Sequence, residues 1–234
     1  MHAEPPRHHS RGQLTHPMMR LNLDRGNTDA LCILCLGSHS DDIEIGCGGT
    51  ILRLARQFPN SVFRWVVFNA VGIRHAEAQR AAELFTGRKE LPGLLLKSFP
   101  DGFMAFMGGE VKAVFEDLKK VVSPDLIFTH TRKDAHQDHR LICELTWNTF
   151  RDHFILEYEI PKYDGDIGTP SVFVPLQSEL CEKKVGYLMD VFQSQQVKHW
   201  FRKDTFLSLM RLRGMECNSP SGYAEAFYCH KLVL

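Results

Sequence analysis

Hydrophobic and polar positions divide the chain into short apolar runs that alternate with amphipathic stretches. Residues 31–36 ("LCILCL") form an unbroken apolar run of strand length. Residues 110–122 instead place apolar side chains at helical spacing along "EVKAVFEDLKKVV". The same criteria predict strands at 31–36, 61–68, 93–99, 125–130, 154–160, 171–176 and 223–234, and helices at 47–57, 74–87, 110–122, 138–151, 177–194 and 204–213.

This alternation of strands and helices predicts an α/β fold with a mostly parallel sheet. Helices on both faces of the sheet would give a Rossmann-like three-layer sandwich, here a single domain over residues 29–234. Residues 1–28 contain proline, histidine and arginine without an apolar segment, so we expect a disordered or loosely packed arm. In such sheets, ligands bind beyond the carboxyl ends of the strands.

Charge and composition exclude several classes of protein. The 28 basic and 28 acidic residues give zero net charge, which argues against a nucleic-acid partner bound through bulk charge. No apolar run approaches the roughly 18 residues of a membrane span. The seven cysteines are odd in number and irregularly spaced, and no secretory signal precedes them, so reduced thiols in a cytoplasmic protein are expected.

Two local patterns could indicate a bound metal ion or a bound phosphate, and both have a simpler interpretation. Cys32 and Cys35 form a C-x-x-C, but residues three apart on a strand point to opposite faces, so we interpret them as core residues. The glycine cluster at 46–49 lacks the third glycine of a dinucleotide loop and the lysine of a P-loop. The acids of "DDIE" at 41–44 would also repel a phosphate, and we expect these glycines to form a tight turn from strand into helix.

Metal binding explains the polar residues that follow two of the predicted strands better than phosphate binding does. His39 and Asp42 stand three residues apart where the first strand ends, and "HTRKDAHQDH" (130–139) follows a later strand. Two histidines and one carboxylate are a common ligand set for catalytic zinc, with one position left open for water. Isolated histidines and acids in loops are usually solvated surface residues, but two such segments at the ends of parallel strands favour one shared metal site.

The two segments together resemble the LmbE-like (PIG-L) N-acetyl-sugar deacetylases. That family carries His-Pro-Asp-Asp followed by a glycine-rich turn, and later His-x-x-Asp-x-His-x-Asp-His. Residues 130–139 agree with the second motif at every fixed position, and residues 39–42 agree with the first except that Ser40 replaces the proline. The resemblance extends over roughly residues 30–234, including "RLRGMECNSPSGYAEAF" near the end of the chain.

The resemblance implies a role for each polar residue of the motifs. His39, Asp42 and His139 would hold Zn²⁺, although iron, cobalt or nickel also suit this ligand set. Asp41 would act as general base, and the metal ion and a protonated His136 would stabilise the oxyanion. The leaving amine would receive its proton from His136 or from the protonated Asp41. The remaining implied residues are supporting ones: Asp138, which would orient His136, and Asp134 and His130, which would support the ligands.

The implied activity is hydrolysis of an N-acetyl group on an amino sugar of the N-acetylglucosamine type, releasing acetate and a free amine. The substrate could be a free sugar, a glycoside, a nucleotide-sugar or an antibiotic intermediate, and a homo-oligomer is compatible with the family. Arg74, Glu77 and Asp101 occupy positions that would contact the sugar, although a surface charge or a turn former explains each equally well. The loop at 161–170 would either cover the site or form a surface turn.

Two other functions compete with this one. An amidase acting on a longer N-acyl group, for example on a lipoglycopeptide, would use the same residues. A non-catalytic sugar-binding module on the same fold belongs to a different class of protein. Asp41 and His136 argue against a binding module, because binding alone requires neither a base nor an oxyanion donor.

Overall fold

The computed structural model describes Leu23 and residues 30–233, so the arm predicted for residues 1–28 lies almost wholly outside the described residues. Its strands are β1 Cys32–His39, β2 Val62–Asn69, β3 Leu94–Leu96, β4 Leu126–His130, β5 Ile155–Tyr158, β6 Val172–Pro175 and β7 Ala224–Tyr228. Its helices are α1 Asp42–Gln57, α2 Ile73–Thr86, α3 Gly108–Val121, α4 Gln137–Thr149, α5 Ser178–Val191 and α6 Lys203–Glu216, with short 3₁₀ turns η1 Met104–Met107 and η2 Gln193–Gln195.

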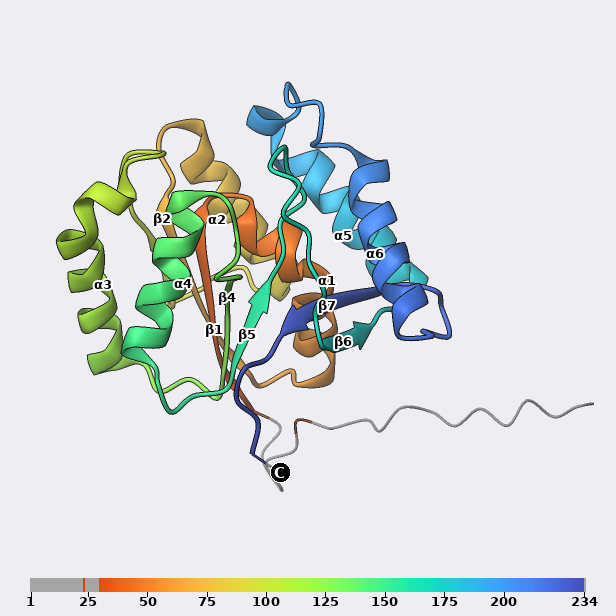
Figure 1. The fold of residues 1–234 in the computed structure, drawn as a ribbon, viewed down its shortest axis with the longest axis horizontal. Coiled ribbons are helices and arrows are strands. Elements are labelled where there is room, and N and C mark those ends of the chain that lie inside the picture. Colours follow the sequence, from red (N-terminus) through yellow and green to blue (C-terminus); the bar gives the residue numbers. More distant parts are fainter. Residues whose placement is uncertain (1–22, 24–29, 234) are drawn as a thin grey trace, which may run out of the picture.

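The strands form one sheet in the order β3-β2-β1-β4-β5-β7-β6 (Figure 1). Strands β1 to β5 pair in parallel, and β7 runs antiparallel between β5 and β6. The chain adds β2 and β3 on one side of β1 and then crosses to place β4 on the other side. The predicted α/β sandwich is therefore confirmed, and its switch point lies between β1 and β4.

Strand β1 contributes to the hydrophobic core on both faces of the sheet. Ile33 and Cys35 pack with the apolar side chains of α1, α2, α5 and α6, whereas Leu34 and Leu36 pack with those of α3 and α4. Cys32 packs against this second cluster, so the two cysteines face opposite sides as predicted. All seven cysteines are free thiols. In the described part of the chain, no helix is both long and apolar enough to cross a membrane.

Helix α1 begins at Asp42, five residues earlier than predicted, so the glycines lie inside a helix and form no turn. Close packing explains their presence. A Cβ atom on Gly46 would lie 2.2 Å from the Tyr158 ring, and one on Gly48 would lie 2.4 Å from the Phe85 ring. Glycine disfavours helix by about 1 kcal/mol per residue, but these contacts with β5 and α2 compensate for that cost.

A buried ion pair also holds α1 from the side. The Lys184 ammonium of α5 donates to the Ile45 carbonyl and to Glu225 of β7, at 2.6 Å in both cases. The Glu225 carboxylate accepts hydrogen bonds from the backbone N–H groups of Gly49 at 2.8 Å and Thr50 at 2.6 Å. Buried charges are tolerated when they are paired and hydrogen-bonded. This contact fixes the helix whose first residue is the candidate ligand Asp42.

We expect Gly46→Ala to lower the free energy of unfolding by about 2 kcal/mol, because the new methyl group overlaps the Tyr158 ring. Gly186→Ala is the matched control, since Gly186 lies within α5 and has no atom within 4 Å of an added Cβ. That variant should gain up to about 1 kcal/mol from helix propensity. Urea denaturation of both variants measures the difference, and equal effects would refute the packing explanation.

Candidate functional site

The two polar motifs meet at the carboxyl ends of β1 and β4. His39 is the last residue of β1, His130 is the last residue of β4, and His136 caps the start of α4. Because parallel strands end at one edge of the sheet, residues about 100 positions apart in sequence become neighbours at the switch point. The site lies at the end of the sheet toward which the β5 arrow points in Figure 1.

Three side chains bring their ligand atoms together. His39 Nδ1 lies 3.1 Å from His139 Nε2, Asp42 Oδ2 lies 3.4 Å from His39 Nδ1, and Asp42 Oδ1 lies 3.5 Å from His139 Nε2. Ligand atoms of a tetrahedral zinc site stand about 3.3 Å apart, since each lies about 2.0 Å from the metal. Asp42 meets the two histidines through different oxygen atoms, so either oxygen, together with His39 Nδ1 and His139 Nε2, could hold a metal ion.

Other donor atoms surround this trio, so the site is rich in possible ligands. His136 lies beside the same rings, with its centroid 5.0 Å from that of His39 and 4.6 Å from that of His139. Besides this trio, three further groups in the described part of the chain have ligand atoms within 4.8 Å of one another: His39–His136–His139, Asp42–His130–His139 and His39–Asp101–His136–Asp138.

Two further residues of the second motif lie directly behind the trio. The Asp134 carboxylate lies 2.9 Å from His139 Nδ1, and a proton on that nitrogen leaves the Nε2 lone pair facing Asp42 and His39. His130 Nε2 lies 3.2 Å from Asp42 Oδ2 and accepts a hydrogen bond from Ser38 N–H at 3.0 Å. The structure thus places Asp134 behind His139 and His130 behind Asp42.

The charges of Asp42 and His139 suit metal ligands, whereas the charge of His39 does not. Burial opposes ionisation of Asp42, but the surrounding histidines outweigh it and hold the pKa of Asp42 well below its usual range. Burial, and next the neighbouring His130, lower the pKa of His139. Asp42 therefore favours its ionised form and His139 its neutral form, which are the forms that bind a metal ion. Burial also opposes protonation of His39, but Asp42, Asp101 and Asp138 outweigh it and raise the pKa of His39 well above its usual range, so His39 has to release a proton when a metal ion binds.

Asp41 differs from its neighbour Asp42. It caps the N-terminus of α1, is only 5% exposed, and makes no capping hydrogen bond through its side chain. Burial and the Asp42 carboxylate raise the pKa of Asp41 to about 6, although Lys198 and His39 act in the opposite direction. Two adjacent carboxylates thus have different proton affinities, and that of Asp41 is the higher. Ser40, which replaces the family proline, is fully buried, and its hydroxyl has no hydrogen-bond partner among the described residues.

Asp138 contacts His136 through its backbone and other residues through its side chain. The backbone N–H of Asp138 donates to His136 Nδ1 at 3.3 Å. The Asp138 carboxylate instead accepts hydrogen bonds from Gly102 N–H at 2.8 Å and Met104 N–H at 3.1 Å. It points toward that turn because Asp138 lies in the first turn of α4, which packs against η1. Asp138 therefore contacts His136 through its backbone and anchors the neighbouring turn with its side chain.

The three predicted substrate residues separate into two groups. Asp101 lies 3.1 Å from His39 Nε2 and accepts a hydrogen bond from Arg74 at 3.2 Å, so both residues adjoin the donor cluster. Glu77 is buried one turn farther along α2. Its carboxylate accepts hydrogen bonds from the Ser194 N–H at 2.9 Å and the Ser194 hydroxyl at 2.5 Å, so Ser194 engages both oxygens.

Lys162 is a supporting residue that the sequence did not reveal. Its ammonium lies 3.0 Å from Asp134 and 2.5 Å from Asp166, and Asp166 also accepts a hydrogen bond from Ala135 N–H at 2.6 Å. The loop at 161–170 is therefore fastened to the second motif directly behind His139. A single lysine in a polar loop carries no sequence signal, since its partner Asp134 lies 28 positions earlier.

We expect Lys162→Met to weaken metal binding about tenfold, because residues behind metal ligands typically contribute 10- to 100-fold to metal affinity. The loss of the ammonium would leave Asp134 free to move away from His139. Competition titration against a zinc-binding dye measures the affinity. Lys133→Met is the control, because Lys133 is an exposed residue of the loop that carries Asp134. Equal affinities in the two variants would show that Lys162 does not support the site.

One known protein family and one bacterial relative resemble this chain in sequence. The profile of the PIG-L family, described as GlcNAc-PI de-N-acetylase, matches residues 34–150, which are 117 of the 234 residues and include both motifs. The uncharacterized deacetylase YaiS of Escherichia coli K12 is 27% identical over 170 residues, covering 67% of this chain and 88% of YaiS.

Two solved structures show the fold in proteins with different activities. The N,N'-diacetylchitobiose deacetylase of Pyrococcus horikoshii superposes with a TM-score of 0.62 at 18% identity, covering 87% of this chain and 84% of that one. GalB of Pseudomonas putida KT2440, a 4-carboxy-2-hydroxymuconate hydratase, superposes with a TM-score of 0.60 at 16% identity, covering 87% and 98%. At these identities the likeness shows the fold alone, so chemistry has to be argued from the site.

Proposed function

This chain belongs to the PIG-L family, and on that premise we propose that it is a metal-dependent deacetylase. It removes the N-acetyl group from an amino sugar and releases acetate and the free amine. The observation that carries the proposal is the trio of His39, Asp42 and His139 at tetrahedral spacing, with Asp41 beside it and free of side-chain capping. The names of the family, of YaiS and of the chitobiose enzyme support the same reaction.

His39, Asp42 and His139 hold the metal ion in this proposal, and Zn²⁺ is the ion that suits them best. Other divalent ions such as iron, cobalt or nickel accept the same ligand set. When bound, the ion supplies Lewis-acid polarisation and makes water a stronger acid. We prefer this trio over Asp42–His130–His139, because the His130 Nε2 atom that faces Asp42 already accepts a hydrogen bond from Ser38 N–H. We also prefer it over the sets that contain His136, because His136 Nδ1 already accepts a hydrogen bond from Asp138 N–H.

Asp41 acts as the general base. Its carboxylate lies next to the ligand Asp42 at the start of α1 and takes a proton from the water that attacks the amide carbonyl. After that transfer the Asp41 carboxyl is neutral and can return the proton to the departing amine nitrogen. The sugar amine and acetate are the products.

His136 stabilises the oxyanion. Its Nδ1 accepts a hydrogen bond from the backbone N–H of Asp138, so the proton of the neutral ring resides on Nε2. Burial and the neighbouring His139 lower the pKa of His136, which favours this neutral form. The Nε2–H group can therefore donate to the developing negative oxygen without the ring being charged.

Arg74 and Asp101 bind the sugar in this proposal. Their ion pair adjoins His39, and both side chains are partly exposed, so each can exchange part of its contact for sugar hydroxyl groups. Glu77 has the weakest case, because Ser194 already engages both of its oxygens. Its role is therefore to hold the segment after α5.

A panel of acyl sugars tests the reaction. The zinc-loaded protein is mixed with N-acetyl, N-butanoyl and N-octanoyl derivatives of glucosamine, and the free amine is quantified. We expect the acetyl derivative to be cleaved with the highest kcat/KM. A preference for the octanoyl derivative would favour the amidase alternative, and cleavage of none of the amides would contradict the proposed reaction.

A further inference from the structure

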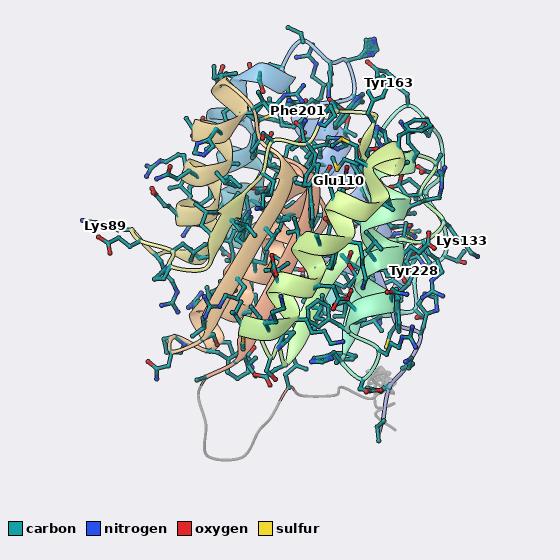
Figure 2. All side chains as sticks on the ribbon, turned by 90° about the vertical axis from the view of Figure 1, so that its left-hand side faces the viewer. Lys89, Glu110, Lys133, Tyr163, Phe201 and Tyr228 are labelled. Carbon is teal, nitrogen blue, oxygen red and sulfur yellow. The ribbon has the colours of Figure 1, made fainter. Side chains whose placement is uncertain are left out.

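The segment between α5 and α6 lies at the same end of the sheet as the site (Figure 1) and is basic. Residues 193–203 ("QSQQVKHWFRK") include two lysines, an arginine and a histidine but no aspartate or glutamate. The segment lies beside the loop at 161–170, at the end of the sheet where β1 and β4 finish (Figure 1). Figure 2 shows Tyr163 of that loop at the same end of the molecule as Phe201 of the segment.

Aromatic rings and a cation alternate where the segment meets this loop. The Tyr163 ring lies 6.1 Å from the His199 ring and 6.5 Å from the Trp200 ring, edge-on in both cases. The Lys198 ammonium lies 5.2 Å from the centre of the Trp200 ring. We call Tyr163, Lys198, His199 and Trp200 the aromatic face; Tyr163 is 69% exposed, so the face is open to solvent.

One chain of contacts places the aromatic face beside the reactive groups. Tyr163 directly follows Lys162, whose ammonium bonds Asp134 behind His139. A substrate bound with its amide at the trio would therefore extend past the aromatic face as it leaves the site.

The side chains of the aromatic face indicate which part of a substrate would bind there. Aromatic rings stack on the planar base of a nucleotide, and a lysine ammonium attracts phosphate oxygens. Sugar rings and alkyl chains also pack on aromatic rings, but neither uses the lysine ammonium, whereas a nucleoside diphosphate uses both the rings and the charge. We propose that the aromatic face binds the nucleoside diphosphate part of an N-acetylated nucleotide-sugar, an inference that rests on the proposed deacetylase function.

Binding of uridine diphosphate alone tests whether the aromatic face binds a nucleoside diphosphate, and it requires no turnover. Isothermal titration of the full chain should show binding that weakens about tenfold in Trp200→Leu and in Lys198→Gln. Lys231→Gln is the matched control, because the Lys231 ammonium lies 5.3 Å from the Trp147 ring in the same type of contact elsewhere on the protein. Equal affinity in all four proteins, or no binding to any of them, overturns the inference.

Kinetics with four substrates separate the inference from the function on which it rests. These are N-acetylglucosamine, its 1-phosphate, its uridine diphosphate conjugate and its octyl glycoside. We expect the nucleotide-sugar to have at least a tenfold higher kcat/KM than the free sugar, and this ratio to fall in Trp200→Leu and remain in Lys231→Gln. Deacetylation that favours the octyl glycoside, or all substrates equally, overturns the inference and leaves the proposed function intact. If no substrate loses its acetyl group while uridine diphosphate still binds through Trp200, the proposed function fails and the nucleotide site stands.

Discussion

Replacing Asp41 by asparagine should lower kcat about a thousandfold and leave the bound metal unchanged. General-base catalysis by a positioned side chain typically contributes 10²- to 10⁴-fold, and asparagine retains the shape of aspartate without a basic carboxylate. Asp41 is not one of the three residues whose ligand atoms converge, so the metal should remain at one ion per chain. Steady-state kinetics and metal analysis by mass spectrometry on the same sample measure both quantities.

The comparison with a surface variant makes this prediction specific. Asp117→Asn removes an exposed carboxylate of α3 that pairs with Lys120, and both activity and metal content should stay at wild-type values. Turnover within tenfold of wild type in Asp41→Asn would contradict the role of general base. Loss of the metal in that variant would instead assign Asp41 to the ligands.

His139→Ala should lose both the metal ion and the activity, because it removes one of three protein ligands. The change also leaves the buried Asp134 facing an empty position where it now contacts His139 at 2.9 Å. Zinc should raise the midpoint of thermal unfolding of the wild-type protein, because a ligand that binds only the folded state stabilises it. We expect no such rise in His139→Ala at the same zinc concentration.

His75→Ala serves as the control for this second prediction. His75 is an exposed histidine of α2, so its removal tests whether any histidine loss lowers zinc binding. It should keep the wild-type rise in unfolding temperature and the wild-type metal content. Full zinc stabilisation in His139→Ala would show that the metal binds elsewhere in the chain.

The local pattern of hydrophobic and polar residues predicted most of the fold, because the strands and most helices have regularly spaced apolar residues. The sheet order could be inferred only in part, yet the strand ends carrying His39 and His130 were enough to predict that the two motifs meet. The predicted start of α1 was wrong, because the residues "GCGG" on their own are typical of a loop. Only the rings of Tyr158 and Phe85, which come from distant parts of the chain, explain why a helix needs glycines there.

The supporting contacts of the site depend on tertiary structure that no local pattern encodes. Lys162 reaches Asp134 across 28 positions, and Lys184 meets Glu225 across 41. A lysine in a loop or on a helix is normally solvated, so its burial against a carboxylate appears only in three dimensions. The contact of the Asp138 side chain could not be predicted for the same reason, since the turn at Gly102 that it bonds lies 36 positions away.

The fold itself cannot decide the reaction, because it resembles both a deacetylase and a hydratase. The reaction therefore depends on the chemistry of His39, Asp42, His139 and Asp41. Acetate release from an N-acetyl sugar, measured as zinc is added stepwise to chelator-treated protein, tests it most directly. We predict no acetate from the metal-free protein and a rate that rises to a plateau at one zinc ion per chain. Acetate release that is undiminished without metal, or absent at one equivalent of zinc, would contradict the account.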